Sequence, residues 1–248
     1  MTPKPNSNPW FAWPKPHPQA KVRLFCVPYA GGGPQIFHKW PESLPPTIEV
    51  CSISAPGRGR RLAEPPFTRL VPLANDLAKS MAGIAHGPFA LFGHSMGAFI
   101  AYEVARRLWS ERRILPVHLF VSGAFAPHIP DRHRLHQLPD AAFIKAVREL
   151  NGMPEQVLAS DELMQLVLPA LRADFSVAET YTCAPDQPLP CPITAFGGET
   201  DPIAFRNEIE PWRAHTTVGF SLHMFPGDHF FLHSAEKQVL EIISTTLA

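Results

Sequence analysis

The sequence predicts an α/β fold, in which helices flank a mostly parallel sheet on both faces. Short apolar runs typical of strands alternate with segments that repeat apolar side chains at helical spacing. This alternation stops between about residues 125 and 190, where only helical patterns are found. Because strand–helix–strand connections produce parallel strands, the order predicts one sheet with an all-helical insertion after its fourth strand.

The first half of the chain contains four of the expected strands. Each is a short apolar run, and turns rich in Gly or Pro close the first two. The helix between the second and third strands is expected from apolar residues at positions 70, 73, 77, 81 and 84. In chain order, the expected elements are a strand over 22–27, a short helix over 37–44, a strand over 48–54, a helix over 70–85, a strand over 88–94, a helix over 96–111 and a strand over 117–124.

The second half begins with the helical insertion and then returns to the alternating pattern. Apolar spacing predicts a helix over 140–150 and one or two helices over 161–181. The remaining expected elements are a fifth strand and its turn over 191–202, a helix around 205–212, a sixth strand over 220–225 and a closing helix over 232–248.

The amino-terminal 20 residues are rich in proline and precede a single expected domain that covers residues 21–248. We expect them to form an extended tail, with Trp10, Phe11 and Trp13 as candidate anchors on the domain. They lack the apolar segment of a signal peptide, and the chain has no apolar run of about 18 residues that would span a membrane. We therefore expect a cytoplasmic enzyme.

Charge and cysteine content exclude several classes of partner. Lys plus Arg and Asp plus Glu both total 22, so the formal net charge is zero and no nucleic-acid partner is expected. The four cysteines, at positions 26, 51, 183 and 191, form no C-x-x-C pair and no zinc-site spacing. We expect thiols in a reducing compartment, no metal, no cofactor and a monomer.

One motif ends the third expected strand, where residues 93–97 read G-H-S-M-G. A match to G-x-S-x-G arises by chance in roughly one chain in ten of this length, so the motif alone is weak evidence. Its position strengthens it, because a strand precedes Ser95 and a helix follows, as a nucleophile elbow requires. Gly93 and Gly97 leave room for the sharp bend. We therefore predict that Ser95 is a nucleophile.

A serine nucleophile needs a base, and the base needs an acid that orients it. On this architecture the acid and then the base follow the serine along the chain. Asp201 follows the fifth expected strand and His229 follows the sixth, at the strand ends where parallel sheets build their sites. We predict these two residues, and the alternatives for the acid are Glu199, in the same turn, and Asp174, which lies in the insertion and is expected to be far from any strand end.

The transition state of acyl transfer needs two backbone N–H donors for its oxyanion. One is expected from Met96, which follows the nucleophile. The other is expected from the loop P-Y-A-G-G-G after the first strand, with Ala30 as our choice and Gly31 as the alternative. This loop matches neither the phosphate-binding nor the dinucleotide-binding glycine motif.

Six blocks of this chain resemble the type II thioesterases, α/β-hydrolases that accompany nonribosomal peptide and polyketide synthases. The resemblance runs from about residue 21 to the carboxyl terminus, and the blocks, in order, are FCVPYAGGGPQIFHKW, PGRGRR, FGHSMGA, LRADFSVAETY, GGETDPI and FPGDHFFL. It implies an α/β-hydrolase fold in which Ser95 is the nucleophile, Asp201 the acid and His229 the base. Asp228 departs from the family, which often has glycine there.

The resemblance also implies a substrate, namely an acyl or aminoacyl group on the phosphopantetheine arm of a carrier protein. The insertion over 125–190 then becomes a lid above Ser95, with a polar, proline-broken start that we expect to be mobile. Because carrier domains are commonly acidic, five arginines are candidates for docking: Arg58, Arg60, Arg61, Arg132 and Arg134. The alternatives are a general esterase or acyltransferase with the same triad, and a carrier-binding module without catalysis.

Overall fold

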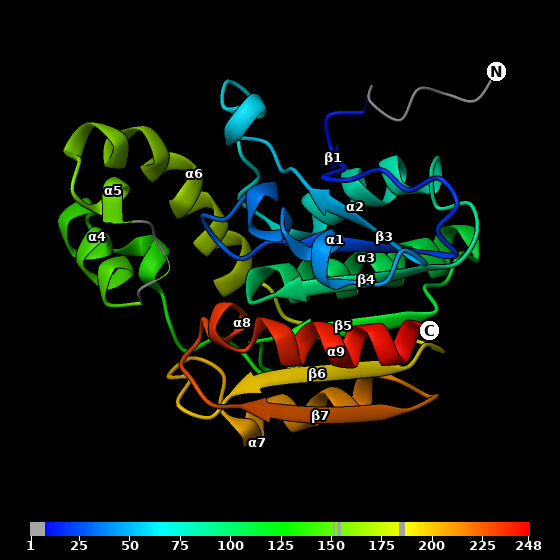
Figure 1. Ribbon diagram of the computed structural model, residues 1–248. Coiled ribbons are helices and arrows are strands. Elements are labelled where there is room, and N and C mark those ends of the chain that lie inside the picture. The colour runs from blue at the N-terminus through cyan, green and yellow to red at the C-terminus, as the bar shows by residue number, and fades with distance from the viewer. Residues whose placement is uncertain (1–7, 151, 153–154, 184–186) are drawn as a thin grey trace.

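A seven-stranded sheet forms the centre of the computed structural model, which describes residues 8–150, 152, 155–183 and 187–248 (Figure 1). The strand order is β1-β3-β2-β4-β5-β6-β7, and all neighbours are parallel except β1 and β3. The mostly parallel sheet expected from the sequence is thus confirmed. The strands are β1 (Phe11–Ala12), β2 (Val22–Val27), β3 (Ile48–Ile53), β4 (Phe89–His94), β5 (His118–Ser122), β6 (Ile193–Gly198) and β7 (Phe220–Phe225).

The sheet has one strand more than the sequence predicts, because the proline-rich segment contributes β1 at its edge. Phe11 and Ala12 pair with Ile53 and Ser52 of β3 in an antiparallel register. Trp10 is only 3% exposed, and the guanidinium of Arg61 lies 4.5 Å from the centre of its ring. The aromatic anchors are therefore confirmed, and their burial against the edge strand brings part of the expected tail into the domain.

Helices cover both faces of the sheet, as the alternation of elements predicts. The helix α9 crosses one face in front of the strands in Figure 1, and α2 and α3 lie on the other. The α-helices outside the insertion are α1 (Trp40–Ser43), α2 (Leu70–Ala82), α3 (Met96–Arg112), α7 (Arg206–Ile209), α8 (Phe231–Ser234) and α9 (Glu236–Leu247). The short 3₁₀ helices there are η1 (Pro34–Phe37), η2 (Gly59–Arg61) and η4 (Glu210–His215).

The strands divide their side chains between two cores because successive residues point to opposite faces. Phe25 and Leu91 join the core beneath α2 and α3, whereas their neighbours Cys26 and Phe92 join the core beneath α1 and α9. Strands β2 to β6 are largely buried on both faces, as is typical of parallel sheets. The sheet is therefore a rigid base for the loops at its carboxyl edge.

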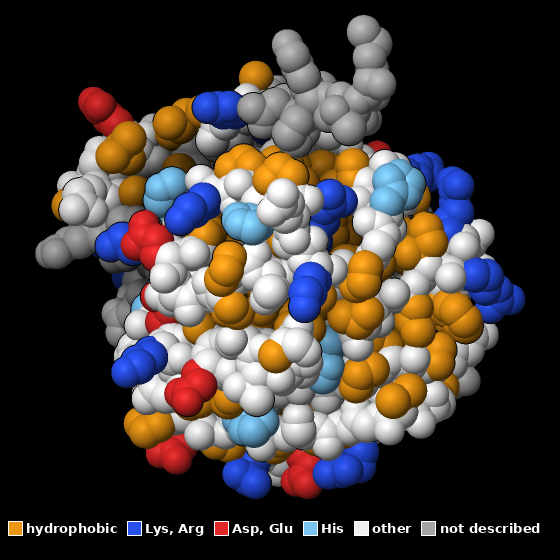
Figure 2. Space-filling view, turned by 45° about the vertical axis from the view of Figure 1, so that its right-hand side comes forward, with side chains coloured by type: hydrophobic (Ala, Val, Ile, Leu, Met, Phe, Trp, Pro, Cys, Tyr) orange, Lys and Arg blue, Asp and Glu red, His pale blue; other side chains and the backbone are white. Residues whose placement is uncertain are grey.

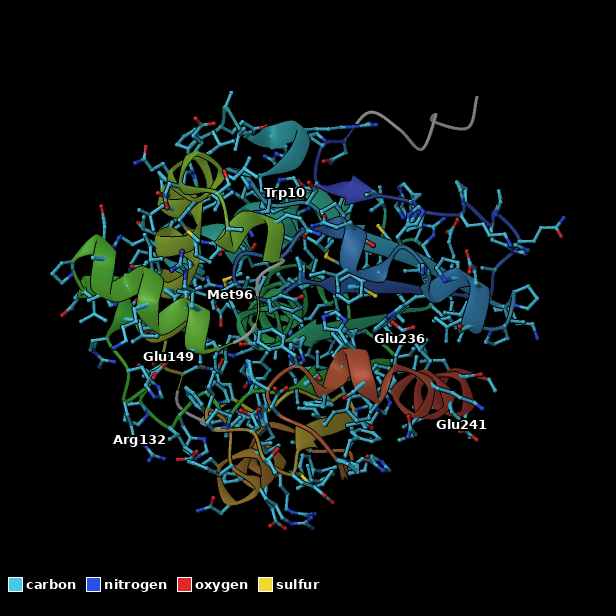
Figure 3. The ribbon with its side chains drawn as sticks, turned by 60° about the vertical axis from the view of Figure 1, so that its left-hand side comes forward. Trp10, Met96, Arg132, Glu149, Glu236 and Glu241 are labelled. Atoms are coloured by element: carbon cyan, nitrogen blue, oxygen red, sulfur yellow. The ribbon has the colours of Figure 1, made fainter. Side chains whose placement is uncertain are left out.

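The helical part of the insertion expected over residues 125–190, which we call the lid, lies beyond the carboxyl ends of the strands (Figure 1). Its described residues form η3 (Leu135–Gln137), α4 (Asp140–Glu149), α5 (Glu155–Leu158) and α6 (Asp161–Glu179). The sequence allowed one or two helices over 161–181, and the structure has one, with Pro169 inside it. In Figure 3, Glu149 and Arg132 lie on the lid side of the molecule, whereas Met96 lies between the lid and the sheet.

Three cysteines, Cys26, Cys51 and Cys191, are buried and Cys183 is partly buried, all as reduced thiols. Burial raises the pKa of the Cys26 and Cys51 thiols well above the ordinary value, so they are unreactive near neutral pH. Within the described ranges, no helix is long and apolar enough to cross a membrane. Figure 2 shows Lys and Arg side chains dispersed among apolar and acidic ones on the face that it displays.

Candidate active site

Ser95 occupies the sharp bend between β4 and α3. Its φ of 55° and ψ of −121° lie in a strained region for a residue with a side chain. The bend is possible because glycines flank it: a Cβ on Gly93 would lie 2.0 Å from the Gly97 oxygen, and one on Gly97 would lie 2.2 Å from the Val27 oxygen. The first turn of α3 therefore packs directly against β4 and the end of β2, and Ser95 is held above the sheet.

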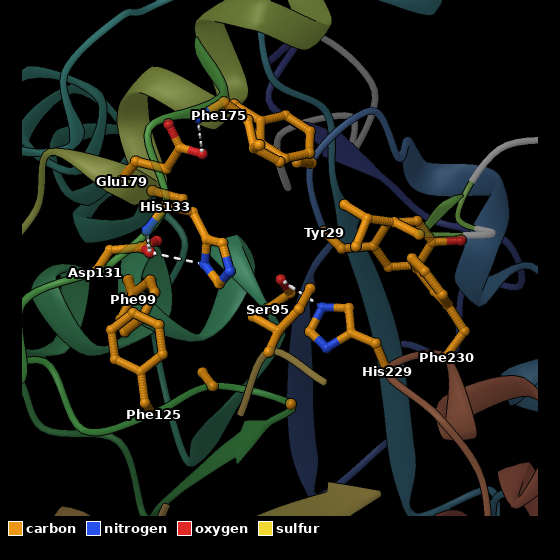
Figure 4. A pocket seen from close by; sticks show the side chains of 17 residues that line it. Tyr29, Ser95, Phe99, Phe125, Asp131, His133, Phe175, Glu179, His229 and Phe230 are labelled. Atoms are coloured by element: carbon orange, nitrogen blue, oxygen red, sulfur yellow. Dashed lines mark hydrogen bonds and ion pairs between the residues drawn. The ribbon is translucent and has the colours of Figure 1, made fainter. Parts of the chain in front are cut away.

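His229 and Asp201 complete a chain of hydrogen bonds that starts at Ser95. His229 Nε2 lies 2.9 Å from Ser95 Oγ, and His229 Nδ1 lies 2.8 Å from Asp201 Oδ2. The three residues follow the carboxyl ends of β4, β7 and β6, which bring them together from 134 residues apart. Figure 4 shows the imidazole of His229 directed at Ser95. The structure thus brings the three predicted residues together in the predicted order.

The hydrogen bonds of Asp201 determine which ring nitrogen of His229 carries the proton. Its Oδ1 accepts hydrogen bonds from the N–H groups of Ile203 at 2.8 Å and Ala204 at 3.2 Å, and the residue is 2% exposed. Because an ionised carboxylate only accepts, the His229 Nδ1–H donates to Asp201 Oδ2. His229 Nε2 is then free to accept the proton of the Ser95 hydroxyl.

The two alternatives for the acid are placed elsewhere. Glu199 is exposed in the same turn, and its N–H donates to the carbonyl of Phe225. Asp174, on α6 of the lid, is paired with Arg58 and accepts a hydrogen bond from the Gly31 N–H. The expectation that Asp174 lies far from any strand end is therefore wrong, because the lid folds back over the loop that follows β2.

His94 is a site residue that the sequence analysis did not identify. Its ring is fully buried beneath His229, and Nε2 lies 2.9 Å from the His229 carbonyl oxygen, to which the Nε2–H donates. Nδ1 lies 2.8 Å from Ser122 Oγ and accepts its proton. Burial, followed by the nearby charge of His229, holds the pKa of His94 well below its ordinary value, so the ring is neutral. The motif contains His94, but only the fold shows its partners.

Two backbone N–H groups close to Ser95 in the fold are the expected donors to an oxyanion. Met96 begins α3, whose first N–H groups have no acceptor in their own helix. Ala30 lines the same pocket as Ser95, and within the described part of the chain neither N–H has an acceptor. The Gly31 N–H, in contrast, donates to Asp174 Oδ2 at 2.8 Å. Because its only proton is engaged there, Gly31 is not available for an oxyanion.

A pocket opens between Ser95 and the lid (Figure 4). Apolar side chains form most of its wall, and the aromatic ones among them come from the core, from α6 and from the segment before α8. The far end is polar: His133 Nδ1 lies 3.2 Å from Asp131 Oδ1, and Glu179 accepts from the N–H groups of Leu135 and His136. The aromatic lining residues are Tyr29, Phe99, Phe125, Phe175 and Phe230. The pocket therefore suits an apolar acyl group.

The structure contradicts the docking role expected for two of the five arginines. The side chains of Arg58 and Arg61 are 13% and 8% exposed, and they pair with Asp174 and Glu64. Both hold loops of this chain together and offer no free charge to a partner. Arg60 is exposed, and Arg132, with a side chain 67% exposed, forms an ion pair with Glu208. The exposed Arg134 donates to the Asp131 carbonyl within the lid.

Comparisons with known proteins assign the chain to a family. The family model described as "Thioesterase domain" matches residues 22–247. The gramicidin S biosynthesis protein GrsT of Aneurinibacillus migulanus is 46% identical over 241 residues, which cover 97% of this chain and 94% of that protein. Thioesterase PikA5 of Streptomyces venezuelae is 40% identical over 251 residues, which cover 100% of this chain and 89% of that protein.

Solved structures agree with this assignment. The type II thioesterase BorB from the borrelidin biosynthetic cluster has a TM-score of 0.90 and 38% identity, with 99% of this chain and 100% of that chain covered. RedJ, a thioesterase from the prodiginine pathway of Streptomyces coelicolor, has a TM-score of 0.87 and 40% identity, with 98% and 91% covered. The fold is therefore that of the α/β-hydrolases, and the chain belongs to the thioesterase domain family.

Proposed function

We propose that this protein hydrolyses thioesters of acyl or aminoacyl groups carried on the phosphopantetheine arm of carrier proteins. The observation that supports this most is the Ser95–His229–Asp201 chain of hydrogen bonds, at 2.9 and 2.8 Å, beside an apolar pocket in a thioesterase fold. Relatives from gramicidin S and prodiginine biosynthesis support carrier proteins as the partners. The cargo would be removed from stalled or wrongly loaded carriers.

In the first half of the reaction, His229 Nε2 takes the Ser95 proton and Oγ attacks the thioester carbonyl carbon. The negative charge that forms on the carbonyl oxygen is held by the N–H groups of Met96 and Ala30. Asp201 stabilises the imidazolium. The carbon–sulfur bond then breaks, the pantetheine sulfur leaves and takes the proton from His229, and the acyl group remains on Ser95. Because thiols ionise near pH 8 to 9, this departure needs little help from an acid.

In the second half, His229 takes a proton from a water molecule, whose oxygen attacks the acyl-Ser95 ester. The ester bond breaks, Ser95 recovers its proton from His229, and the free acid leaves. These steps need neither a metal nor a bound cofactor, since the substrate itself carries the phosphopantetheine. We propose that the protein works as a monomer in the cytoplasm, a reducing compartment that suits its reduced thiols.

The proposal is tested with Ser95→Ala and matched substrates. One acyl group is presented on a carrier protein, on a small thiol and as an oxygen ester, and the kcat/KM of the wild type is measured for each. We expect the carrier thioester to be hydrolysed fastest and Ser95→Ala to lower kcat by about six orders of magnitude, as loss of the triad serine does in a protease. A preference for oxygen esters would identify an esterase instead. Hydrolysis that survives in Ser95→Ala would remove Ser95 from the mechanism.

A further inference from the structure

The loop that carries Ala30 is held from the lid side by a single carboxylate. In this loop Gly31 has a φ of +75°, and its N–H donates to Asp174 Oδ2 at 2.8 Å. The next peptide is also fixed, because the Gly32 N–H donates to the Tyr29 carbonyl at 2.9 Å. The direction of the Ala30 N–H is therefore set by a turn whose outer side bonds to the lid helix α6.

Arg58 ties the same carboxylate to the loop a second time. Its Nη2 lies 2.6 Å from Asp174 Oδ1, and its Nη1 lies 2.9 Å from Oδ2, a two-point contact. Nη1 also donates to the carbonyl of Gly32 at 3.0 Å. Asp174 is 1% exposed, and a buried carboxylate needs such a cation to stay ionised. Three segments thus meet at the ion pair of Asp174 with Arg58. They are the loop over residues 28–33, which we call the glycine loop, the loop after β3, and the helix α6.

Contacts without charge place α6 against the same two loops. A Cβ on Gly31 would lie 2.8 Å from Leu171 Cδ1, and a Cβ on Gly57 would lie 3.3 Å from Ala170 Cβ. Leu171 and Asp174 are three residues apart, so they lie on the same side of the helix. The lid helix therefore covers the glycine loop closely, and a displacement of α6 would withdraw Asp174 from the Gly31 N–H.

We propose that Asp174 and Arg58 are positioning residues that aim the Ala30 N–H at the oxyanion, so that the lid helix completes the oxyanion hole. This inference rests on the proposed function, because it assigns Ala30 the role of a donor in acyl transfer. The pair touches neither the reacting atoms nor the wall of the pocket beside Ser95. Its loss therefore weakens binding of the transition state much more than binding of the substrate.

The experiment compares Asp174→Ala, Asp174→Asn and Arg58→Lys with the wild type. Asp174→Asn keeps the shape of the side chain if the alanine variant does not fold, and Arg58→Lys loses the two-point contact. The matched control is Asp140→Asn. This substitution removes the ion pair between Asp140 on α4 and Arg172 on α6, which lies away from the glycine loop. Thermal unfolding by circular dichroism shows which variants are folded.

The decisive measurement uses two ligands of Ser95 that differ in one respect. A trifluoromethyl ketone with an acyl-like chain forms an adduct with Ser95 that carries an oxyanion, whereas the corresponding methyl ketone binds without one. We expect Asp174→Ala to lower kcat about 10- to 100-fold, below the 10²- to 10³-fold cost of deleting a donor, because the N–H is misaimed but present. In Asp174→Ala, KM should change less than about threefold. The affinity for the trifluoromethyl ketone should fall by the same factor as kcat/KM, whereas the affinity for the methyl ketone should stay unchanged.

Folded variants of Asp174 and Arg58 that bind the trifluoromethyl ketone as tightly as Asp140→Asn would overturn the inference. Equal weakening of both ketones would also overturn it, since that result indicates a collapsed pocket. The two proposals fail separately. If the wild type hydrolyses no thioester yet its trifluoromethyl ketone affinity depends on Asp174, the substrate assignment fails and the positioning role stands.

Discussion

Replacing Asp201 with Asn tests how the site sets the protons of His229. Asp201 Oδ1 accepts from the N–H groups of Ile203 and Ala204, so an asparagine must place its own carbonyl oxygen there. Its NH₂ group then occupies the position of Oδ2, 2.8 Å from His229 Nδ1. Because that NH₂ group donates, Nδ1 has to accept and the ring proton moves to Nε2. His229 then cannot take the proton of Ser95.

The expected loss follows from this exchange of tautomers. The matching substitution in a serine protease triad lowers kcat by about 10⁴-fold, which corresponds to about 5.4 kcal/mol at 1.36 kcal/mol for each factor of ten. The free energy of unfolding should change little, because Asp201→Asn keeps a side chain of the same size with all three hydrogen bonds in place. Steady-state hydrolysis of a small thioester measures the first effect, and urea denaturation measures the second.

Glu199→Gln is the matched control, since Glu199 is exposed in the same turn. We expect it to retain the wild-type rate. If Asp201→Asn keeps more than a tenth of the activity and Glu199→Gln loses it, the acid is Glu199 and the assignment of Asp201 is wrong. If neither variant loses activity, the tautomer of His229 is set by another group.

Two further predictions concern stability. Burial lowers the pKa of His118 and of His215 to about 4, from an ordinary value of 6.5, so both are neutral in the native state and bind protons only after unfolding. The free energy of unfolding should therefore fall as the pH decreases from about 6.5 to about 4. Over this range the urea midpoint should fall less steeply with pH in His215→Asn than in the wild type, and equal slopes for the two proteins would contradict the prediction. Gly97→Ala places a Cβ 2.2 Å from the Val27 carbonyl oxygen, whereas Gly219 has no atom of the described chain within 4 Å of an added Cβ. Gly97→Ala should lower the free energy of unfolding by about 3 kcal/mol and remove most of the activity, whereas Gly219→Ala should change neither. Urea denaturation and thioester hydrolysis measure the two effects. Wild-type stability and activity in Gly97→Ala would refute the tight packing of α3 on β2.

Most of the sheet could be predicted from local patterns. Two strands, Val22–Val27 and Phe220–Phe225, have the expected bounds, because their apolar runs end at turn-forming residues. The strand β1 could not be predicted, since two residues in a proline-rich segment carry no period. Its pairing depends on where the edge of β3 lies. The closing helix divides into α8 and α9 at Ala235, a break that the apolar pattern does not show.

The site divides in the same way between local and distant information. Sequence alone determined Ser95, Asp201 and His229 as a set, because a bend between strand and helix is a local pattern and the strand ends of a parallel sheet meet at one edge. Their catalytic roles stay predictions. Sequence alone also determined that the chain resembles type II thioesterases, a family that the comparisons confirm.

Only the tertiary structure decided which buried charges and polar groups pair. Arg58 looks like a surface arginine in the sequence, and Asp174 looks like a helical residue of the lid, yet they form a buried ion pair across 116 residues. His94 and the carbonyl of His229 meet across 135 residues. Such pairs form because burial makes an unpartnered polar group costly, and the partner is whatever the packing brings within reach. No local pattern in the sequence records that choice.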